Sequence, residues 1–157
     1  MKDGFIKVAT ASPEIRVADC AYNAGQIISA MQEASRKGAK LLVLPELCLT
    51  GYTCGDLFLQ RVLLDGALLA LAQILRQTAQ LEMVTIIGLP IRSQGQLYNC
   101  AAVLYQGQLL GLVPKSHLPN YGEFYELRHF SPAPEENRTF QWEGRDVPFG
   151  KQFPNTY

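Results

Sequence analysis

Hydrophobic and polar positions alternate near the start of the chain and then take up a helical period. Residues from Phe5 to Ala11 alternate between apolar and small or polar side chains, which predicts a first strand. From Ala24 to Ala34 the apolar residues recur at intervals of three and four, which predicts a helix. Asp19 can cap the start of this helix, and Gly38 follows its basic end. A β-α unit is therefore expected first.

A second β-α unit follows, and its strand is apolar at every position. The run from Leu41 to Leu44 predicts a strand covered on both faces, and Pro45 ends it because proline has no N–H to donate. A helical period returns from Leu63 to Leu75, and the run from Met83 to Leu89 predicts another buried strand.

Two hairpins are predicted in the remaining sequence. Tyr98 to Tyr105 and Gln108 to Val113 flank the turn Gln106-Gly107, and Arg138 to Trp142 precedes a turn at Glu143-Gly144. Between the hairpins the chain is irregular and aromatic. This order of elements predicts an α/β fold in which helices cover one face of a mixed sheet.

Composition narrows the class of protein. The 157 residues suit one domain, and with 48% hydrophobic and 18% charged residues they can bury a substantial core. Fourteen basic residues balance fourteen acidic ones without a basic run, so neither nucleic acid nor a membrane surface is an expected partner. No apolar run approaches the roughly 20 residues of a membrane helix, and no signal-peptide pattern opens the chain, so we expect a cytoplasmic protein.

The four cysteines do not form a recognisable disulfide or metal pattern. Cys20, Cys48, Cys54 and Cys100 lack C-x-x-C spacing, which in a cytosolic chain is typical of reduced thiols. The two histidines, His117 and His129, lie far from them in sequence and are expected in loops. We therefore expect no metal site.

Two opposite charges follow buried strands and are the first candidates for chemistry. Glu46 comes directly after the run Leu41 to Leu44, and Lys115 follows the second strand of the first predicted hairpin. A lone charge at such a position is costly, whereas two opposite charges there suggest a preorganised catalytic pair. Alternatively, both are solvated loop residues, and Glu126 pairs with Lys115 or Arg128 on an exposed turn. Such an exposed ion pair would add little to the stability of the fold.

The segments that carry these charges resemble known motifs. Leu44 to Tyr52 (LPELCLTGY), followed by Asp56-Leu57-Phe58, resembles the segment with the general-base glutamate in the carbon-nitrogen hydrolase, or nitrilase, superfamily. Within it, Val113 to Phe130 (VPKSHLPNYGEFYELRHF) is similar to the glutaminase domain of glutamine-dependent NAD synthetases, and Leu97 to Leu104 fits the strand that leads to the lysine.

The resemblance implies an α/β fold, a nitrilase-like αββα sandwich with a mixed sheet, and a Glu-Lys-Cys triad. It makes Glu46 the general base, Lys115 the stabiliser of the tetrahedral intermediate and Glu126 the carboxylate that holds the lysine. A thiol attacks as thiolate and so needs such a base, while the ammonium can neutralise charge on the amide oxygen. The pocket for L-glutamine would be lined by Tyr121, Tyr52 and Phe124; alternatively, the aromatic cluster of Tyr121, Phe124, Tyr125 and Phe130 is a satellite core.

The third member of the triad has no match in this sequence. In the family the nucleophilic cysteine lies well after the lysine, whereas no cysteine follows Lys115. Cys48 or Cys54 is the alternative nucleophile, although a cysteine in an apolar segment is usually a packed hydrophobe. We expect residues 1–150 to form the N-terminal part of a glutaminase domain, a sandwich that is incomplete because its C-terminal strands are missing, and to be inactive alone. Residues 151–157 would be a short tail that a truncation or a frame change could have introduced.

The resemblance also implies partners and cofactors. The intact parent would release ammonia from glutamine to a synthetase domain, which would use ATP and Mg; this region would hold neither. L-Glutamine, the missing synthetase domain and further copies of the sandwich are the expected partners. Two alternatives remain: a fragment of a stand-alone amidase or carbamoylase, and a non-catalytic association module.

Overall fold

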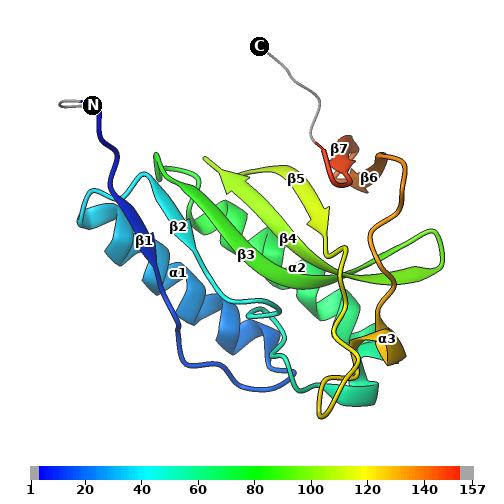
Figure 1. The fold of residues 1–157 in the computed structure, drawn as a ribbon. Coiled ribbons are helices and arrows are strands. Elements are labelled where there is room, and N and C mark those ends of the chain that lie inside the picture. The colour runs from blue at the N-terminus through cyan, green and yellow to red at the C-terminus, as the bar shows by residue number, and fades with distance from the viewer. Residues whose placement is uncertain (1–3, 153–157) are drawn as a thin grey trace.

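The computed structural model describes residues 4–152, which form one sheet with helices on one side. The long helices α1 (Cys20–Arg36) and α2 (Arg61–Gln77) lie side by side behind the sheet in the view of Figure 1. The short helices η1 (Gly55–Leu59) and α3 (Glu126–His129) lie near one another at one end of the sheet. Both long helices agree with the sequence prediction.

The sheet has seven strands. In chain order they are β1 (Val8–Thr10), β2 (Leu41–Val43), β3 (Val84–Ser93), β4 (Gln96–Tyr105), β5 (Gln108–Pro114), β6 (Arg138–Trp142) and β7 (Arg145–Phe149). Across the sheet the order is β1-β2-β3-β4-β5-β7-β6. β1, β2 and β3 run parallel, β3, β4 and β5 alternate in direction, and β7 runs parallel to β5. The predicted mixed sheet is confirmed.

The first helix begins and ends where its sequence signals lie. The Asp19 carboxylate accepts a hydrogen bond from the Tyr22 backbone N–H at 3.0 Å, which satisfies a free donor of the first turn. After the last turn, Gly38 takes φ +80°, a conformation that glycine adopts without steric cost. The predicted apolar face, from Ala24 to Ala34, is buried.

Three two-residue turns connect antiparallel strands, and the sequence prediction missed one of them. Gln106-Gly107 and Glu143-Gly144 join β4 to β5 and β6 to β7, as predicted. Gln94-Gly95 has the same positive φ at both positions and joins β3 to β4, so these strands are longer than expected. The first strand is shorter than expected, at Val8–Thr10.

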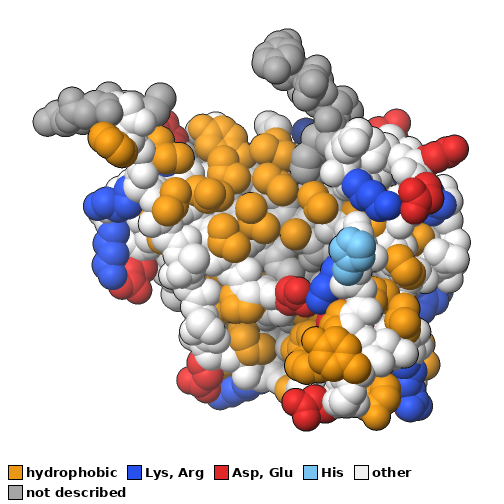
Figure 2. All heavy atoms as spheres, in the orientation of Figure 1, with side chains coloured by type: hydrophobic (Ala, Val, Ile, Leu, Met, Phe, Trp, Pro, Cys, Tyr) orange, Lys and Arg blue, Asp and Glu red, His pale blue; other side chains and the backbone are white. Residues whose placement is uncertain are grey.

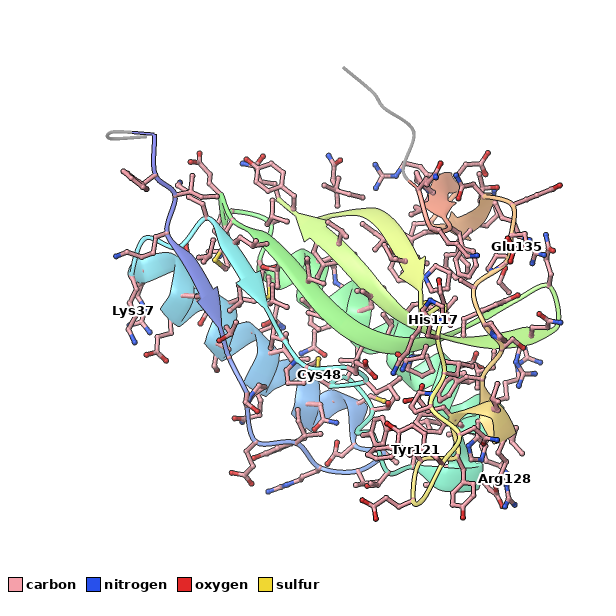
Figure 3. The ribbon with its side chains drawn as sticks, in the orientation of Figure 1. Lys37, Cys48, His117, Tyr121, Arg128 and Glu135 are labelled. Atoms are coloured by element: carbon pink, nitrogen blue, oxygen red, sulfur yellow. The ribbon has the colours of Figure 1, made fainter. Side chains whose placement is uncertain are left out.

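The second half of the chain contains a short helix that the sequence did not predict. The segment predicted to be irregular includes α3, and His129 lies in this helix and not in a loop. His117 lies on the loop after β5, as predicted (Figure 3). Of the predicted tail 151–157, all but Lys151 and Gln152 lies outside the described residues. No helix within residues 4–152 is both long and apolar enough to cross a membrane.

The two faces of the sheet differ in what covers them. Leu42 and Ile87 are fully buried on the face that carries the helices. Val43 pairs with Ile86, which pairs with Val103, so these three side chains lie in a row on the opposite face. There they are only partly buried or exposed, and Figure 2 shows hydrophobic side chains gathered over this side of the sheet. Among the described residues, this chain therefore supplies one helix layer and one sheet, with the second sheet face open.

Candidate active site

Glu46 lies in a tight loop just past the end of β2. The Leu44 N–H still donates to the Ile86 carbonyl at 3.0 Å, after which the chain turns away from the sheet. Leu47 takes φ +51°, which is uncommon for a leucine and marks a constrained turn. The Leu47 side chain is fully buried and anchors the loop, while the side chain of Glu46 remains about half exposed.

The loop passes directly over Gly88 on β3, and only glycine fits there. A Cβ atom on this residue would come 2.7 Å from the Pro45 carbonyl oxygen and 2.8 Å from the Glu46 carbonyl carbon, and it would be closer still to the Leu47 nitrogen. The Leu49 N–H donates to the Gly88 carbonyl at 3.1 Å. Glycine allows the two backbones to come this close because it has no Cβ atom. The contact fixes the height of Glu46 above the sheet.

Lys115 brings two carboxylates together. It follows the last residue of β5, and its Nζ lies 2.9 Å from Glu46 Oε2 and 3.0 Å from Glu126 Oε1. Glu46 is 69 residues away in sequence, and Glu126 is the first residue of α3. The predicted pairing of Glu46 with Lys115 is thus present in the fold.

Burial is unequal among these three charged groups. The side chain of Glu126 is 5% exposed, that of Lys115 25% and that of Glu46 52%. The alternative in which Glu126 sits on an exposed turn is therefore wrong. The Tyr52 hydroxyl donates to Glu126 Oε1 at 2.8 Å, whereas Oε2 has no hydrogen-bond partner among the described residues. A buried carboxylate requires such compensation, and Lys115 and Tyr52 supply it.

The cluster shifts the pKa values of its proton donors. Burial lowers the pKa of Lys115, but its hydrogen bonds and ion pairs with Glu46 and Glu126 outweigh burial and leave the pKa above its ordinary value. Burial, together with the hydrogen bond to Glu126, raises the pKa of Tyr52 to about 12. Lys115 is therefore an ammonium, and Tyr52 is a neutral hydroxyl, throughout the neutral pH range.

One pocket of about 230 Å³ brings together all six residues that the sequence singled out. It is lined by Glu46, Tyr52, Lys115, Pro119, Tyr121, Phe124 and Glu126. The rings of Tyr121 and Phe124 pack edge to face with centroids 5.8 Å apart. Tyr121, labelled in Figure 3, is 71% exposed and forms the outer rim, while Glu126 is the most deeply buried of the charged groups that line the pocket.

The short helix that carries Glu126 is held in place by η1. Asp56 Oδ2 lies 3.2 Å from an Arg128 nitrogen, and Asp56 Oδ1 lies 3.0 Å from His129 Nε2. The hydrogen bond with His129 and the charge of Arg128 lower the pKa of Asp56 below its ordinary value. Below them the rings of Phe58 and Phe130 pack with centroids 4.9 Å apart. These contacts fix α3, which is too short to be stable alone.

The sequence prediction missed Asn99, a residue of β4 that contacts Glu46. Its Nδ2 donates to Glu46 Oε2 at 3.2 Å, and its backbone carbonyl accepts from the Lys115 N–H at 2.8 Å. Asn99 is 3% exposed. A signal was available: it is the one amide side chain in the apolar run from Leu97 to Leu104, and a buried amide needs hydrogen-bond partners.

The cysteines do not supply the missing thiolate. All four are buried, and burial raises the pKa of each thiol. Cys48, two residues after Glu46, reaches a pKa of about 11, and its Sγ lies 3.7 Å from the Gly88 carbonyl oxygen. Cys54 contacts the Thr50 carbonyl oxygen at 3.2 Å. Such thiols hold their protons at neutral pH and are poor nucleophiles.

This arrangement provides a half-exposed carboxylate and a fixed positive charge, but no exposed thiol among residues 4–152. A carboxylate that is half open to solvent can accept a proton, and the ammonium beside it can stabilise developing negative charge. Within residues 4–152, no group of three or more His, Cys, Asp or Glu side chains is placed to hold a metal ion.

Three comparisons relate this chain to known proteins. The carbon-nitrogen hydrolase family model matches residues 7–153. The glutamine-dependent NAD(+) synthetase of Mycobacterium tuberculosis is 40% identical over 147 residues, which are 94% of this chain and 22% of that protein. The crystal structure of the corresponding enzyme from Cytophaga hutchinsonii superposes with a TM-score of 0.89 at 32% identity, over 97% of this chain and 26% of that one.

A smaller enzyme is also similar. The structure of an amidase from Nesterenkonia sp. matches with a TM-score of 0.71 at 26% identity, over 94% of this chain and 56% of that one. Variants of that amidase have been solved with molecules added at its active site cysteine. The chain thus spans about a quarter of the NAD(+) synthetases it matches and about half of the amidase. With a family match over nearly its whole length, this chain belongs to the carbon-nitrogen hydrolase family.

Proposed function

We propose that this chain is the N-terminal part of the glutamine-hydrolysing domain of a glutamine-dependent NAD(+) synthetase. The observation that carries the proposal is the single ammonium of Lys115 held between Glu46 and Glu126 in a pocket walled by Tyr52, Tyr121 and Phe124. The curated relatives with 33% to 40% identity over more than nine tenths of the chain bear that name.

Each charged group has a distinct role in this proposal. Glu46 takes the proton of the attacking thiol and gives it to the departing ammonia as the thioester forms. It then takes a proton from the water that hydrolyses the thioester and returns it to the released thiolate, a role usually worth about 10²- to 10⁴-fold in rate. Lys115 donates to the oxygen of the glutamine amide as negative charge develops there. Glu126 remains on the far side of Lys115 and keeps its ammonium in place.

The nucleophile in this proposal is a cysteine outside residues 1–157. Support comes from the four buried thiols of the chain, whose raised pKa values make them unsuitable. The related amidase has an active site cysteine, and this chain spans about half of that protein. The chain alone should therefore release no ammonia from glutamine above background.

The proposal extends to the whole protein. Ammonia would pass to a synthetase domain that amidates deamido-NAD with ATP and Mg, and the protein would be cytoplasmic, where its free thiols stay reduced. Residues 1–150 would form the first part of the glutaminase domain. The isolated chain, which lacks the later strands of the sandwich, would self-associate through the open sheet face, because a continuous apolar surface of this kind favours association.

A chimera tests the proposed chemistry. Residues 7–153 replace the matching stretch of the M. tuberculosis NAD(+) synthetase, and NAD(+) formation is measured with glutamine or with ammonia as nitrogen donor. We expect the chimera to use glutamine and expect Glu46→Gln to reduce this activity at least about 10²-fold. Activity with ammonia should be unchanged, because it bypasses the base. A chimera that uses ammonia well but never glutamine would contradict the proposal.

The second candidate is a stand-alone amidase, which the match to the Nesterenkonia enzyme favours. The matching half of that amidase can be replaced in the same way and the product assayed with simple aliphatic amides and with glutamine. The aromatic rim of Tyr121 and Phe124 leads us to expect a preference for glutamine. A preference for short amides would favour the amidase.

A further inference from the structure

The carboxylate of Glu46 has one orientation in the fold, although little of its side chain is packed. Its side chain is 52% exposed, so packing alone does not hold it. A long flexible side chain at such a position ordinarily samples several rotamers, and holding it in one of them costs conformational entropy. Hydrogen bonds must therefore set its direction.

Both donors that reach this carboxylate bind the same oxygen. Lys115 Nζ lies 2.9 Å from Oε2, and Asn99 Nδ2 lies 3.2 Å from it. No donor of residues 4–152 is hydrogen-bonded to Oε1. The two oxygens are thus unequal: one is occupied by a cation and an amide, and the other is available to accept a proton.

Lys115 alone does not fix the orientation of the Glu46 carboxylate. Its ammonium sits on a flexible four-carbon stem, and it is shared with Glu126, which is the more deeply buried partner. An ammonium drawn toward Glu126 would leave Glu46 free to rotate into solvent. A second donor on a rigid support removes this freedom.

Asn99 has the properties of such a donor. It is 3% exposed, and its place on β4 is opposite Pro90 of β3. Its backbone carbonyl accepts from the Lys115 N–H at 2.8 Å, so one residue contacts the base with its side chain and the start of the lysine segment with its backbone. The amide is neutral, and it can therefore orient the carboxylate without competing with Lys115 for charge.

We propose that Asn99 is a positioning residue that binds Oε2 of Glu46 and thereby makes Oε1 the oxygen that takes the proton. This assignment rests on the proposed function, in which Glu46 is the base, and adds to it a residue that orients Glu46. The geometric claim, that Asn99 holds Glu46 against Lys115, is tested without any measurement of activity.

The first test is Asn99→Leu, which keeps the side-chain size and removes the donor. Once Glu46 can rotate away, Lys115 loses part of one ion pair, so the NMR titration midpoint of its side-chain carbons should shift downward. The matched control is Thr85→Val, because Thr85 is a fully buried polar residue of the neighbouring β3 whose hydroxyl has no partner among the described residues. This control should leave the Lys115 titration unchanged. An unchanged titration in folded Asn99→Leu would overturn the proposal.

A second test leaves Asn99 in place, in case its replacement prevents folding. Glu46→Ala removes a half-exposed side chain and should leave the chain folded. The side-chain amide protons of Asn99 should then lose the chemical-shift separation and slow exchange that a hydrogen bond to a carboxylate produces. If the Asn99 amide resonances are the same with and without Glu46, the contact is absent in solution and Asn99 positions nothing. Failure of either test would leave the proposed glutamine chemistry standing.

Discussion

At the scale of single residues, the central fact is that one ammonium compensates two carboxylates of very different burial. Glu126 is almost fully buried, while Glu46 is half exposed. Removing one partner of a buried pair is strongly destabilising, because the other charge then has no compensation. Lys115 should therefore contribute to folding mainly through Glu126 and to chemistry mainly through Glu46.

Replacing Lys115 should destabilise the fold, because the buried carboxylate of Glu126 loses its ion pair. We expect Lys115→Met to lower the free energy of unfolding by about 2 to 4 kcal/mol, measured by urea denaturation at neutral pH. The double variant Lys115→Met with Glu126→Gln should recover at least half of the loss, because the uncompensated carboxylate is gone. Lys151→Met, which breaks an exposed pair with Glu135, serves as control and should change stability by less than about 1 kcal/mol.

The raised pKa of Tyr52 leads us to expect that the fold loses stability at high pH. Its pKa in the fold is about 12 against 10 for the free side chain, so between these values the unfolded chain has lost a proton that the folded chain keeps. This contribution is complete below pH 10 and disappears as the pH rises toward 12. Denaturation at a series of pH values should show a weaker decline for Tyr52→Phe. An exposed tyrosine variant, Tyr125→Phe, should retain the wild-type decline.

The residues of the site differ in how far sequence could predict them. Glu46 and Lys115 each follow a strand end within a distinctive motif, so their pairing could be predicted from the sequence and is present in the fold; their roles stay proposals. The roles of Asn99 and Gly88 depend on the register of β4 against β3 and on how the loop after β2 crosses the sheet. Register is set by long-range pairing, which a local pattern does not contain.

At the scale of elements, the loop after β2 and strand β3 act as one unit. The loop contacts β3 at Gly88, and two of its backbone N–H groups, those of Leu44 and Leu49, donate to β3 carbonyl oxygens. Any side chain at Gly88 must lift the loop, and the loop carries Glu46. The position of Glu46, the proposed base, therefore depends on a glycine on another strand.

Gly88→Ala should move this loop. We expect a loss of about 1 to 3 kcal/mol in unfolding free energy from overpacking, and a fall in the pKa of Lys115 as Glu46 is displaced. Urea denaturation and an NMR titration of Lys115 measure the two effects. Gly25→Ala is the matched control: a Cβ there meets nothing within 4 Å, and helix propensity predicts a gain of up to about 1 kcal/mol. Wild-type stability in Gly88→Ala would contradict the close approach.

Local signals predicted the long elements and failed for α3. Both long helices have an apolar period of many residues, and the hairpins have glycine turns, so local sequence determines them. α3 has four residues and is held by Asp56 and Phe58, about 70 positions earlier in the chain. Such a helix exists because of tertiary contacts, and these have no local signature.

At the scale of the whole molecule, the open face of the sheet is the dominant feature. The row formed by Val43, Ile86 and Val103 crosses three strands and stays accessible, whereas the opposite face is covered by helices. Burying such a row removes apolar area from water and favours association at about 25 cal/mol per Å². The helices expose a second apolar feature, Leu69 on α2, which is 72% exposed.

Charged substitutions should distinguish these two surfaces. We expect the wild-type chain to self-associate and the double variant Val43→Glu with Val103→Glu to be monomeric in sedimentation velocity. Leu69→Glu is the control on the helix side and should leave association unchanged. The reverse result, with Leu69→Glu alone dissociating the chain, would assign association to the helices. A monomeric wild-type chain would contradict self-association altogether.

The shared lysine would also affect how the proposed reaction ends. Two carboxylate side chains, those of Glu46 and Glu126, share the single ammonium of Lys115. Hydrolysis converts a neutral amide into an acid that ionises at neutral pH, so repulsion arises only after the bond is broken. In the proposed reaction, such a site would bind the charged product less tightly than the neutral amide and would so favour release of the product.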